Sequence, residues 1–181
     1  MKKLAFALSI LAAGLLALPR TASAEPYIAS LNLLAGVGGS IDGEPTSGFG
    51  NANFELGVAV PTDVNTVVSL RLGKLDLSKR SSFEGLTDAD LEYVSVAGEY
   101  RFAENYYTSG IFMGLGAYRL GGEAASGHQD ETQVGVILGV DGEFQITRRL
   151  YFLVQVAGHW VNFTHAAQMY ANAQAGLAFH F

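Results

Sequence analysis

Several residue types are missing or rare in this chain of 181 residues. It has no Cys, 4 Pro and 1 Trp, and its 11 Lys and Arg are outnumbered by 17 Asp and Glu. Without Cys no disulfide can form, so the fold has to close through backbone pairing and side-chain packing alone. The acidic balance argues against nucleic acid or an anionic surface as a partner. Beyond residue 24 no apolar run approaches the ~18 residues of a membrane-spanning helix, so no such helix is predicted there.

The first 24 residues have the layout of a secretory signal peptide. Lys2 and Lys3 give it a basic start, an apolar run follows over residues 4–18, and Ala22-Ser23-Ala24 offers small residues for cleavage. We therefore predict that residues 1–24 are removed on export and that residues 25–181 form one domain. An uncleaved membrane anchor is the alternative interpretation, although the apolar run is short for a spanning helix.

The rest of the sequence alternates between apolar and polar residues with a period of two, which is the pattern of β-strands. The 22 Gly residues also suit a crowded sheet better than a helical protein. In the third predicted strand the apolar residues fall at even-numbered positions up to Leu72 and at odd-numbered positions from Leu75. We therefore expect a bulge near Gly73 and Lys74. Short turns are predicted after the second, fourth and sixth strands, including one at residues 61–63, and longer polar loops after the first, third and fifth, including one over residues 122–130. Eight strands are predicted, over residues 27–40, 49–60, 65–78, 90–102, 107–121, 131–145, 150–163 and 169–181.

The last predicted strand ends on an aromatic residue. Its apolar face widens toward the terminus through Leu177, Phe179 and Phe181. An ordered apolar edge strand invites aggregation, whereas a closed barrel pairs its last strand with its first and leaves neither edge free. The predicted fold class is therefore all-β, an eight-stranded antiparallel up-and-down β-barrel that crosses a membrane.

The two faces of the predicted strands differ in chemistry. One row is apolar, and it carries no charge over about seven residues in several strands, where a charge facing lipid would cost ~2–4 kcal/mol. The other row mixes small residues with charged and amide side chains, as expected in a narrow lumen. We prefer this arrangement to a soluble lipocalin-like barrel with the apolar row inside. The polar side chains predicted to lie in the lumen are Glu55, Arg71, Glu99, Arg101, Glu143, Gln155, His159 and Gln174.

Aromatic residues fall at two heights of the predicted barrel, as in the girdles that mark membrane interfaces. The first group, near the short turns, contains Tyr100, Phe102, Tyr106, Tyr107, Phe144, Tyr151, Phe152, Phe179 and Phe181. The second group, near the longer loops, contains Phe49, Trp160, Phe163 and Tyr170. Because both termini lie on the short-turn side, we predict that this side faces the periplasm and that the longer loops face outward.

Residues 25–181 resemble the small eight-stranded outer-membrane barrels of the OmpA/OmpX type and the broader outer membrane protein β-barrel domain family. The resemblance is carried by the order of strands and turns, by the strand–turn–strand unit at residues 142–153, and by Leu177, Phe179 and Phe181 at the end. That ending is similar to the signal with which such proteins reach the barrel assembly machinery. The resemblance implies a bacterial outer-membrane location, contact with the lipid bilayer and lipopolysaccharide, and a monomer. It says little about activity.

The predicted function is non-enzymatic, with a polar plugged lumen and a structural or surface-interaction role through outward loops around Gly43, Ser82 and Gly127. No cofactor, metal site or catalytic residue is predicted. A narrow ion pore is one alternative, because the lumen charges could line a path, although eight strands leave little free bore.

A lipid-A-modifying enzyme is the other alternative. The lipid A deacylases that this chain resembles in size use a His-x-Ser pair, because Ser needs an adjacent base. Neither His159 nor His165 has Ser two residues later, and Thr164 directly precedes His165. We also considered divalent-cation binding by the oxygen-rich segment with Glu123, His128, Asp130 and Glu131, but its spacing matches no known cation loop, which favours a solvated segment.

Overall fold

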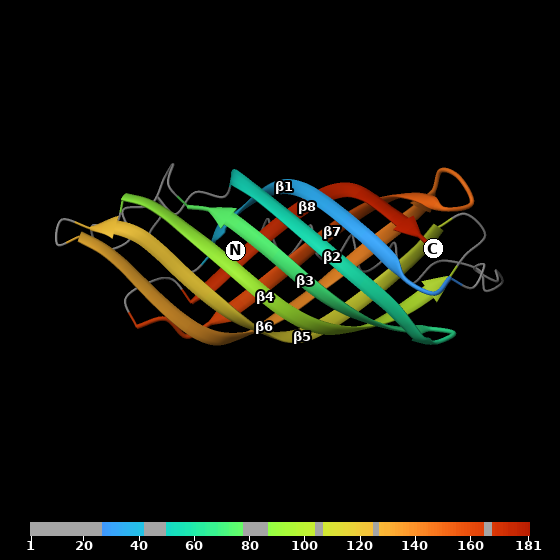
Figure 1. The fold of residues 1–181 in the computed structure, drawn as a ribbon, viewed down its shortest axis with the longest axis horizontal. Coiled ribbons are helices and arrows are strands. Elements are labelled where there is room, and N and C mark those ends of the chain that lie inside the picture. The colour runs from blue at the N-terminus through green and yellow to red at the C-terminus, as the bar shows by residue number, and fades with distance from the viewer. Residues whose placement is uncertain (1–26, 42–49, 78–86, 104–106, 125–126, 165–167) are drawn as a thin grey trace, which may run out of the picture.

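The computed structural model describes residues 27–41, 50–77, 87–103, 107–124, 127–164 and 168–181 (Figure 1). The predicted signal peptide lies outside these residues. No helix in the described part of the chain is long and apolar enough to cross a membrane. The strands are β1 (Ser30–Ser40), β2 (Asn51–Asp63), β3 (Thr66–Asp76), β4 (Thr87–Ala103), β5 (Tyr107–Ala124), β6 (Gly127–Gln145), β7 (Leu150–Val161) and β8 (Met169–His180).

The eight strands form one closed barrel in chain order. Each strand pairs antiparallel with the next, and β8 returns to pair with β1, so that Leu33 of β1 lies opposite Leu56 on one side and Leu177 on the other. Closure gives every strand two hydrogen-bonded neighbours and removes the free edges that an open sheet would present. The predicted fold class is confirmed.

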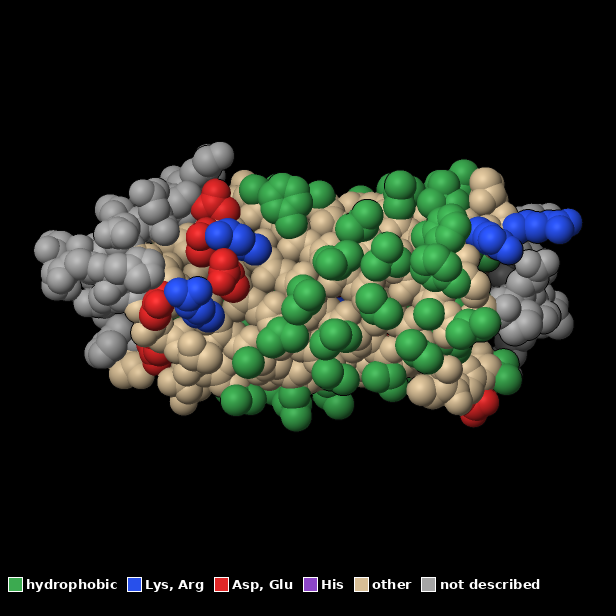
Figure 2. Space-filling view, viewed as in Figure 1, with side chains coloured by type: hydrophobic (Ala, Val, Ile, Leu, Met, Phe, Trp, Pro, Cys, Tyr) green, Lys and Arg blue, Asp and Glu red, His purple; other side chains and the backbone are tan. Residues whose placement is uncertain are grey.

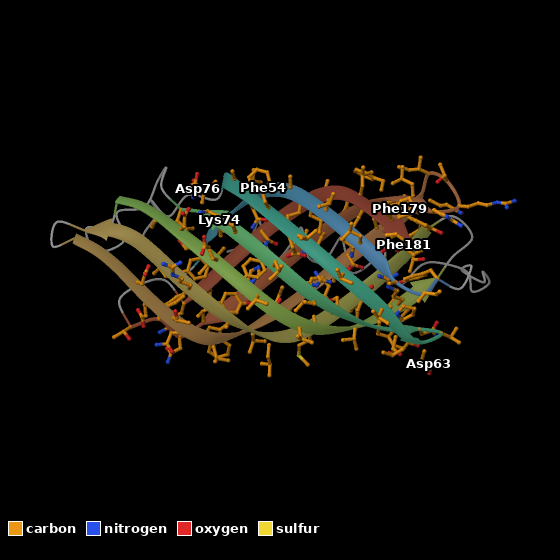
Figure 3. The ribbon with its side chains drawn as sticks, in the orientation of Figure 1. Phe54, Asp63, Lys74, Asp76, Phe179 and Phe181 are labelled. Atoms are coloured by element: carbon orange, nitrogen blue, oxygen red, sulfur yellow. The ribbon has the colours of Figure 1, made fainter. Side chains whose placement is uncertain are left out.

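The two ends of the barrel differ in their connections. We call the end where β8 finishes the turn end and the opposite end the loop end. Figure 3 shows Asp63, Phe179 and Phe181 at the turn end, and Lys74 and Asp76 nearer the loop end. The turn predicted at residues 61–63 is shifted, because β2 continues through Pro61 to Asp63.

The predicted long loop at residues 122–130 is wrong. β5 continues to Ala124 and β6 begins at Gly127, and these two residues are paired with each other. Backbone pairing between β5 and β6 therefore continues through this polar segment as a hairpin.

The predicted bulge near Gly73 and Lys74 is also wrong. β3 keeps regular register with β2 and β4 from Leu72 through Leu75. The apolar positions shift by one residue because the apolar side chains move from the outer face of the strand to its inner face. Leu70 and Leu72 point outward and are each 47% exposed, whereas Leu75 and Leu77 point inward and are each 1% exposed. Along β3, therefore, the outer surface of the barrel is apolar up to Leu72, and the lumen is apolar from Leu75 onward.

The exterior of the barrel carries a broad apolar belt (Figure 2). Its members come from every strand and include Leu33, Phe54, Val58, Leu70, Val96, Leu115, Leu138, Val156 and Leu177, all exposed. Soluble monomers rarely expose a contiguous apolar area of more than a few hundred Å². The charged row is buried on the inner side of the same strands. The apolar row therefore faces lipid, and the lipocalin-like arrangement is excluded.

Candidate functional site

The lumen is the region of the chain in which charged side chains are concentrated away from water. Because neighbouring strands are paired in register, their inward residues lie at similar heights along the barrel axis. Side chains that are distant in sequence therefore meet across the barrel. These inward residues form polar networks from the turn end to the middle and an apolar cluster at the loop end.

Arg101 of β4 organises the network near the turn end. Its Nε donates a hydrogen bond to Glu99 Oε1 at 2.5 Å, and its two Nη atoms each approach an oxygen of Glu143 at 3.2 Å. Nη1 also donates to Tyr27 Oη at 2.6 Å. The His180 ring is stacked between the rings of Tyr27 and Tyr151, at centroid distances of 4.0 and 4.1 Å. Charge-assisted bonds of this kind are strong where water is excluded.

His180 closes this network from the last strand. Its Nε2 lies 3.3 Å from Glu143 Oε2. Tyr27 precedes β1 and His180 ends β8, so the ring contact between them joins the two strands whose pairing closes the barrel.

Arg71 of β3 crosses the middle of the lumen. Its Nη1 donates to Gln155 Oε1 of β7 at 2.5 Å and to Glu55 Oε1 of β2 at 3.3 Å. Its Nη2 lies 3.8 Å from Glu99 Oε2 and 3.9 Å from Asp141 Oδ2. The guanidinium also lies 3.8 Å from the centroid of the Phe112 ring. One cation thus contacts carboxylates from three strands and an amide from a fourth across the lumen.

Amide and phenol groups complete the middle layer. Tyr93 Oη donates to Glu55 Oε2 at 2.6 Å, and Gln155 Nε2 donates to Gln174 Oε1 at 3.0 Å. Gln174 Nε2 in turn donates to Asn53 Oδ1. These hydrogen bonds lower the cost of burying the groups, although Asn53 Nδ2 has no hydrogen-bond partner among the described residues.

His159 lies above this layer, toward the loop end. Its Nδ1 is 3.1 Å from Tyr118 Oη, its Nε2 is 3.1 Å from Asn172 Nδ2, and its ring lies 4.8 Å from that of Tyr93. Both ring nitrogens therefore have partners inside the lumen. This position is remote from the lipid face, where a lipid-modifying catalytic base would have to lie.

Buried apolar and aromatic side chains gather toward the loop end of the lumen. This apolar cluster consists of Leu75, Leu77, Ala89, Leu91, Tyr93, Tyr118, Leu120, Val161, Phe163 and Tyr170. Phe163 and Tyr170 were predicted to belong to an outer aromatic girdle, and that prediction is wrong because both rings are buried inside. Trp160, from the same predicted group, is exposed on the outside. Phe49 and Tyr106 lie outside the described residues.

Glycines make room for the large side chains of the lumen. A Cβ built on Gly73 would overlap the Tyr93 ring, and one built on Gly139 would overlap Phe112. Both rings therefore lie against the inner wall of the barrel, at positions where only Gly leaves enough space. The Phe112 ring that packs on Gly139 is also the ring against which the Arg71 guanidinium lies.

All the polar side chains predicted to face the lumen do so, and each is buried. The structure brings Glu55, Arg71 and Gln155 together, and separately joins Glu99, Arg101 and Glu143. Sequence reasoning did not identify Tyr27 and His180 as parts of the network, although His180 stands in the polar row of the last strand. It also missed the apolar cluster at the loop end, for which the parity change at Leu75 was the available signal.

The other residues considered for chemistry are placed differently. Thr164 Oγ1 donates to Glu131 Oε1 at 2.9 Å, so both are engaged in a contact between β6 and the segment after β7. His165 lies outside the described residues, as do the side chains of Glu123 and His128. Within the parts of the chain that the structure describes, no group of three or more His, Asp and Glu side chains could hold a metal ion.

The fold is similar to solved outer-membrane proteins, although no family model and no curated protein matches the sequence. Neisserial surface protein A has 12% identity and a TM-score of 0.71, over 84% of this chain and 97% of that one. The N-terminal β-barrel domain of Pseudomonas aeruginosa OprF has 11% identity and a TM-score of 0.62, over 86% and 100%. Ail of Yersinia pestis has 15% identity and a TM-score of 0.55, over 85% and 99%.

This chain has the fold of a small bacterial outer-membrane barrel. The apolar belt of Figure 2 is accordingly the surface that contacts hydrocarbon. Exposed aromatic side chains at the turn end, including the ring pairs Tyr100–Phe102 and Phe179–Phe181, lie where a girdle at one membrane interface is expected. Tyr151, predicted for the same girdle, instead packs inward on His180.

Proposed function

We propose that this chain is a non-enzymatic integral protein of the bacterial outer membrane with a lumen closed by its own side chains. Its contacts with other molecules are made on the outside of the barrel and at the outward loop end. In this proposal the protein is a monomer, lies among lipids and lipopolysaccharide, and is assembled through its C-terminal strand. The role is structural or one of surface interaction.

The observation that carries the proposal is the succession of buried side-chain layers along the lumen. Arg101, Arg71 and His159 lie in successive layers, and each is bonded to side chains of other strands. The apolar cluster around Tyr118 and Tyr170 then occupies the loop-end half. An eight-stranded barrel has an interior just wide enough for side chains to fill, and the buried side chains of these layers support a filled interior.

Single-channel recording tests the closed lumen. We expect the refolded protein to insert into planar bilayers and produce no resolvable conductance steps, because the side chains around Arg71 and those of the apolar cluster lie across the lumen. Insertion of folded barrel is verified by the heat-modifiable gel migration of protein recovered from the same vesicles. Reproducible steps that depend on the presence of the barrel would contradict the proposal and favour the narrow pore.

The surface-interaction role is tested at the outward loops. The segments around Gly43 and Ser82 lie outside the described residues, whereas Gly127 is the first residue of β6. We expect shortening of the first two segments to abolish any surface binding while leaving heat-modifiable migration unchanged. Unchanged surface binding by a barrel that lacks both segments would contradict this assignment.

A further inference from the structure

The charged part of the lumen, from Arg71 to the turn end, contains more carboxylates than guanidinium groups among the residues that the structure describes. Their side chains have exposed fractions between 2% and 9%, and they belong to Glu55, Glu99, Asp141, Glu143, Arg71 and Arg101. A buried charge is stable only where an opposite charge and hydrogen bonds compensate it. Since two guanidinium groups face four carboxylates, part of the negative charge needs another source of compensation.

Three of the four carboxylates accept hydrogen bonds from the two guanidinium groups. Arg101 approaches the two oxygens of Glu143 at 3.2 Å through its Nη atoms, and its Nε donates to Glu99 Oε1 at 2.5 Å. Arg71 Nη1 donates to Glu55 Oε1 at 3.3 Å. Hydrogen bonds between ionised groups are among the strongest in proteins, so these three carboxylates are stabilised in their charged form.

Asp141 is the carboxyl group that this arrangement leaves without a hydrogen-bonded cation. The nearest cationic atom of the described residues is Arg71 Nη2, which lies 3.9 Å from Asp141 Oδ2 and is too distant for a hydrogen bond. The other oxygen lies beside Glu99, because a Cβ built on Gly110 would be less than 3.0 Å from both Asp141 Oδ1 and Glu99 Oε1. Gly110 of β5 is paired with Asp141 of β6, and its missing side chain leaves a space in which the two carboxyl groups meet.

We propose that Glu99 and Asp141 form a proton-binding site in the lumen and share one proton between Asp141 Oδ1 and Glu99 Oε1. The O–H group of a neutral Asp141 donates to the ionised Glu99, which continues to accept from Arg101. The shared proton removes the repulsion between two adjacent carboxylates and gives Asp141 the hydrogen bond that no cation supplies. This inference goes beyond the proposed function, because it concerns what the lumen binds and not what the barrel does outside.

The groups around the pair leave the proton as the compensation for Asp141. The charged and titratable side chains that face the pair, directly or through one neighbour, are Arg71 of β3, Arg101 of β4, Glu143 of β6, Glu55 of β2, Tyr27 before β1 and His180 of β8. β5 and β7 pair with Asp141 through Gly110 and Gln155, which do not titrate. A protonated His180 would balance one negative charge, but it lies 3.3 Å from Glu143.

Infrared spectroscopy of barrel refolded into detergent at neutral pH tests the shared proton directly. Wild-type protein should show the C=O stretching band of a protonated carboxyl group, at different positions after refolding in H2O and in D2O. Asp141→Asn should lose this band. Asp130→Asn, the same change at an exposed position of β6, should retain it. Absence of the band from folded wild-type protein, or its persistence in folded Asp141→Asn, would overturn the proposal.

Urea unfolding of the heat-modifiable barrel at neutral pH gives an independent measurement. Asp141→Asn replaces a neutral carboxyl group by a neutral amide of the same shape, so the urea midpoint should not fall. Glu143→Gln removes an ionised carboxylate that is bonded to Arg101, and its midpoint should fall. Equal falls for the two variants would show that Asp141 is ionised and would overturn the proposal. The infrared comparison stands even where Glu143→Gln does not fold, because it uses other variants.

The pH dependence of the urea midpoint separates a proton from a metal cation on the pair. The wild-type midpoint should fall as the pH is raised from neutral to alkaline values, because the folded barrel holds a proton that the unfolded chain has released. Asp141→Asn keeps every other titratable group of the lumen and should lack the part of the fall that belongs to the pair. Identical pH profiles of the two proteins would contradict the shared proton. A wild-type midpoint that rises with sodium ion concentration at constant ionic strength, with no rise for Asp141→Asn, would assign the site to a metal cation instead.

Discussion

Arg71 is the cation on which the middle of the lumen depends. Its guanidinium faces Glu55, Glu99 and Asp141, and all of these side chains are shielded from water. Attraction between buried charges offsets a large desolvation cost only while both partners are present. Arg71 therefore stabilises the barrel by compensating carboxylates that already lie inside.

The first prediction concerns the loss of this cation. Arg71→Met should destabilise the barrel by ~3–5 kcal/mol, because it leaves buried carboxylates uncompensated. The measurement is the urea midpoint of heat-modifiable barrel in detergent. Arg148→Met, at an exposed position, should change stability by less than about 0.5 kcal/mol. The double variant Glu55→Gln/Arg71→Met should be more stable than Arg71→Met, and equal stability of all these proteins would contradict the network.

The second prediction concerns the space at Gly73. Gly73→Ala should destabilise by ~1–3 kcal/mol, since its methyl group would overlap the Tyr93 ring and push it from Glu55. Gly98→Ala is the matched control, because a Cβ at Gly98 meets no atom within 4 Å. Urea unfolding of the two variants in one detergent compares them. A Gly73→Ala barrel as stable as Gly98→Ala would show that Tyr93 does not occupy this space in solution.

At the scale of the strand, alternation predicts which side of the sheet each residue faces, but not what occupies that side at a given height. Leu75 and Leu77 show the limit. Leu75 continues β3 in regular register and Leu77 directly follows the strand, yet the alternating pattern alone made the two residues indicate a bulge. The lumen changes from charged to apolar along the barrel axis. The alternation within one strand cannot predict this change, because the other seven strands supply most of the side chains in the lumen.

β8 presents apolar side chains to the lipid and also pairs with β1 to close the barrel. Beyond it, Phe181 N donates to Ala29 O at 2.9 Å and Ile28 N donates to Phe181 O at 2.9 Å, so the terminal residue pairs through its backbone while its ring is exposed. The ring of Phe181 therefore lies on the outer surface of the barrel.

The third prediction follows from the different roles of the backbone and the ring of Phe181. Phe181→Ala should lower the amount of barrel in the outer membrane of expressing cells several-fold and leave refolding in detergent unchanged, because the backbone pairing is retained. Phe144→Ala removes an exposed ring at the same end from β6 and is the control. Immunoblots of outer-membrane fractions compare the two. Equal losses for both variants would show that the terminal position has no special part in assembly.

At the scale of the whole molecule, the order of eight strands and the inward row were predictable because lipid outside and a narrow lumen inside impose one period on every strand. Contacts across the lumen were not predictable in the same way. Arg71 meets Gln155, and Tyr27 meets His180, only because closure brings distant strands to the same height.

The central claim is that apolar side chains face hydrocarbon while the alternate row is sealed inside. The absence of native Cys allows single-cysteine variants to test it directly. Val68→Cys and Val94→Cys lie at positions 43% and 42% exposed, and their neighbours Ser69→Cys and Ser95→Cys lie at positions 2% and 1% exposed. In barrels reconstituted into bilayers, a thiol reagent dissolved in the membrane should label the first two variants and spare the other two. Labelling of positions 69 and 95 with protection of 68 and 94 would contradict the account.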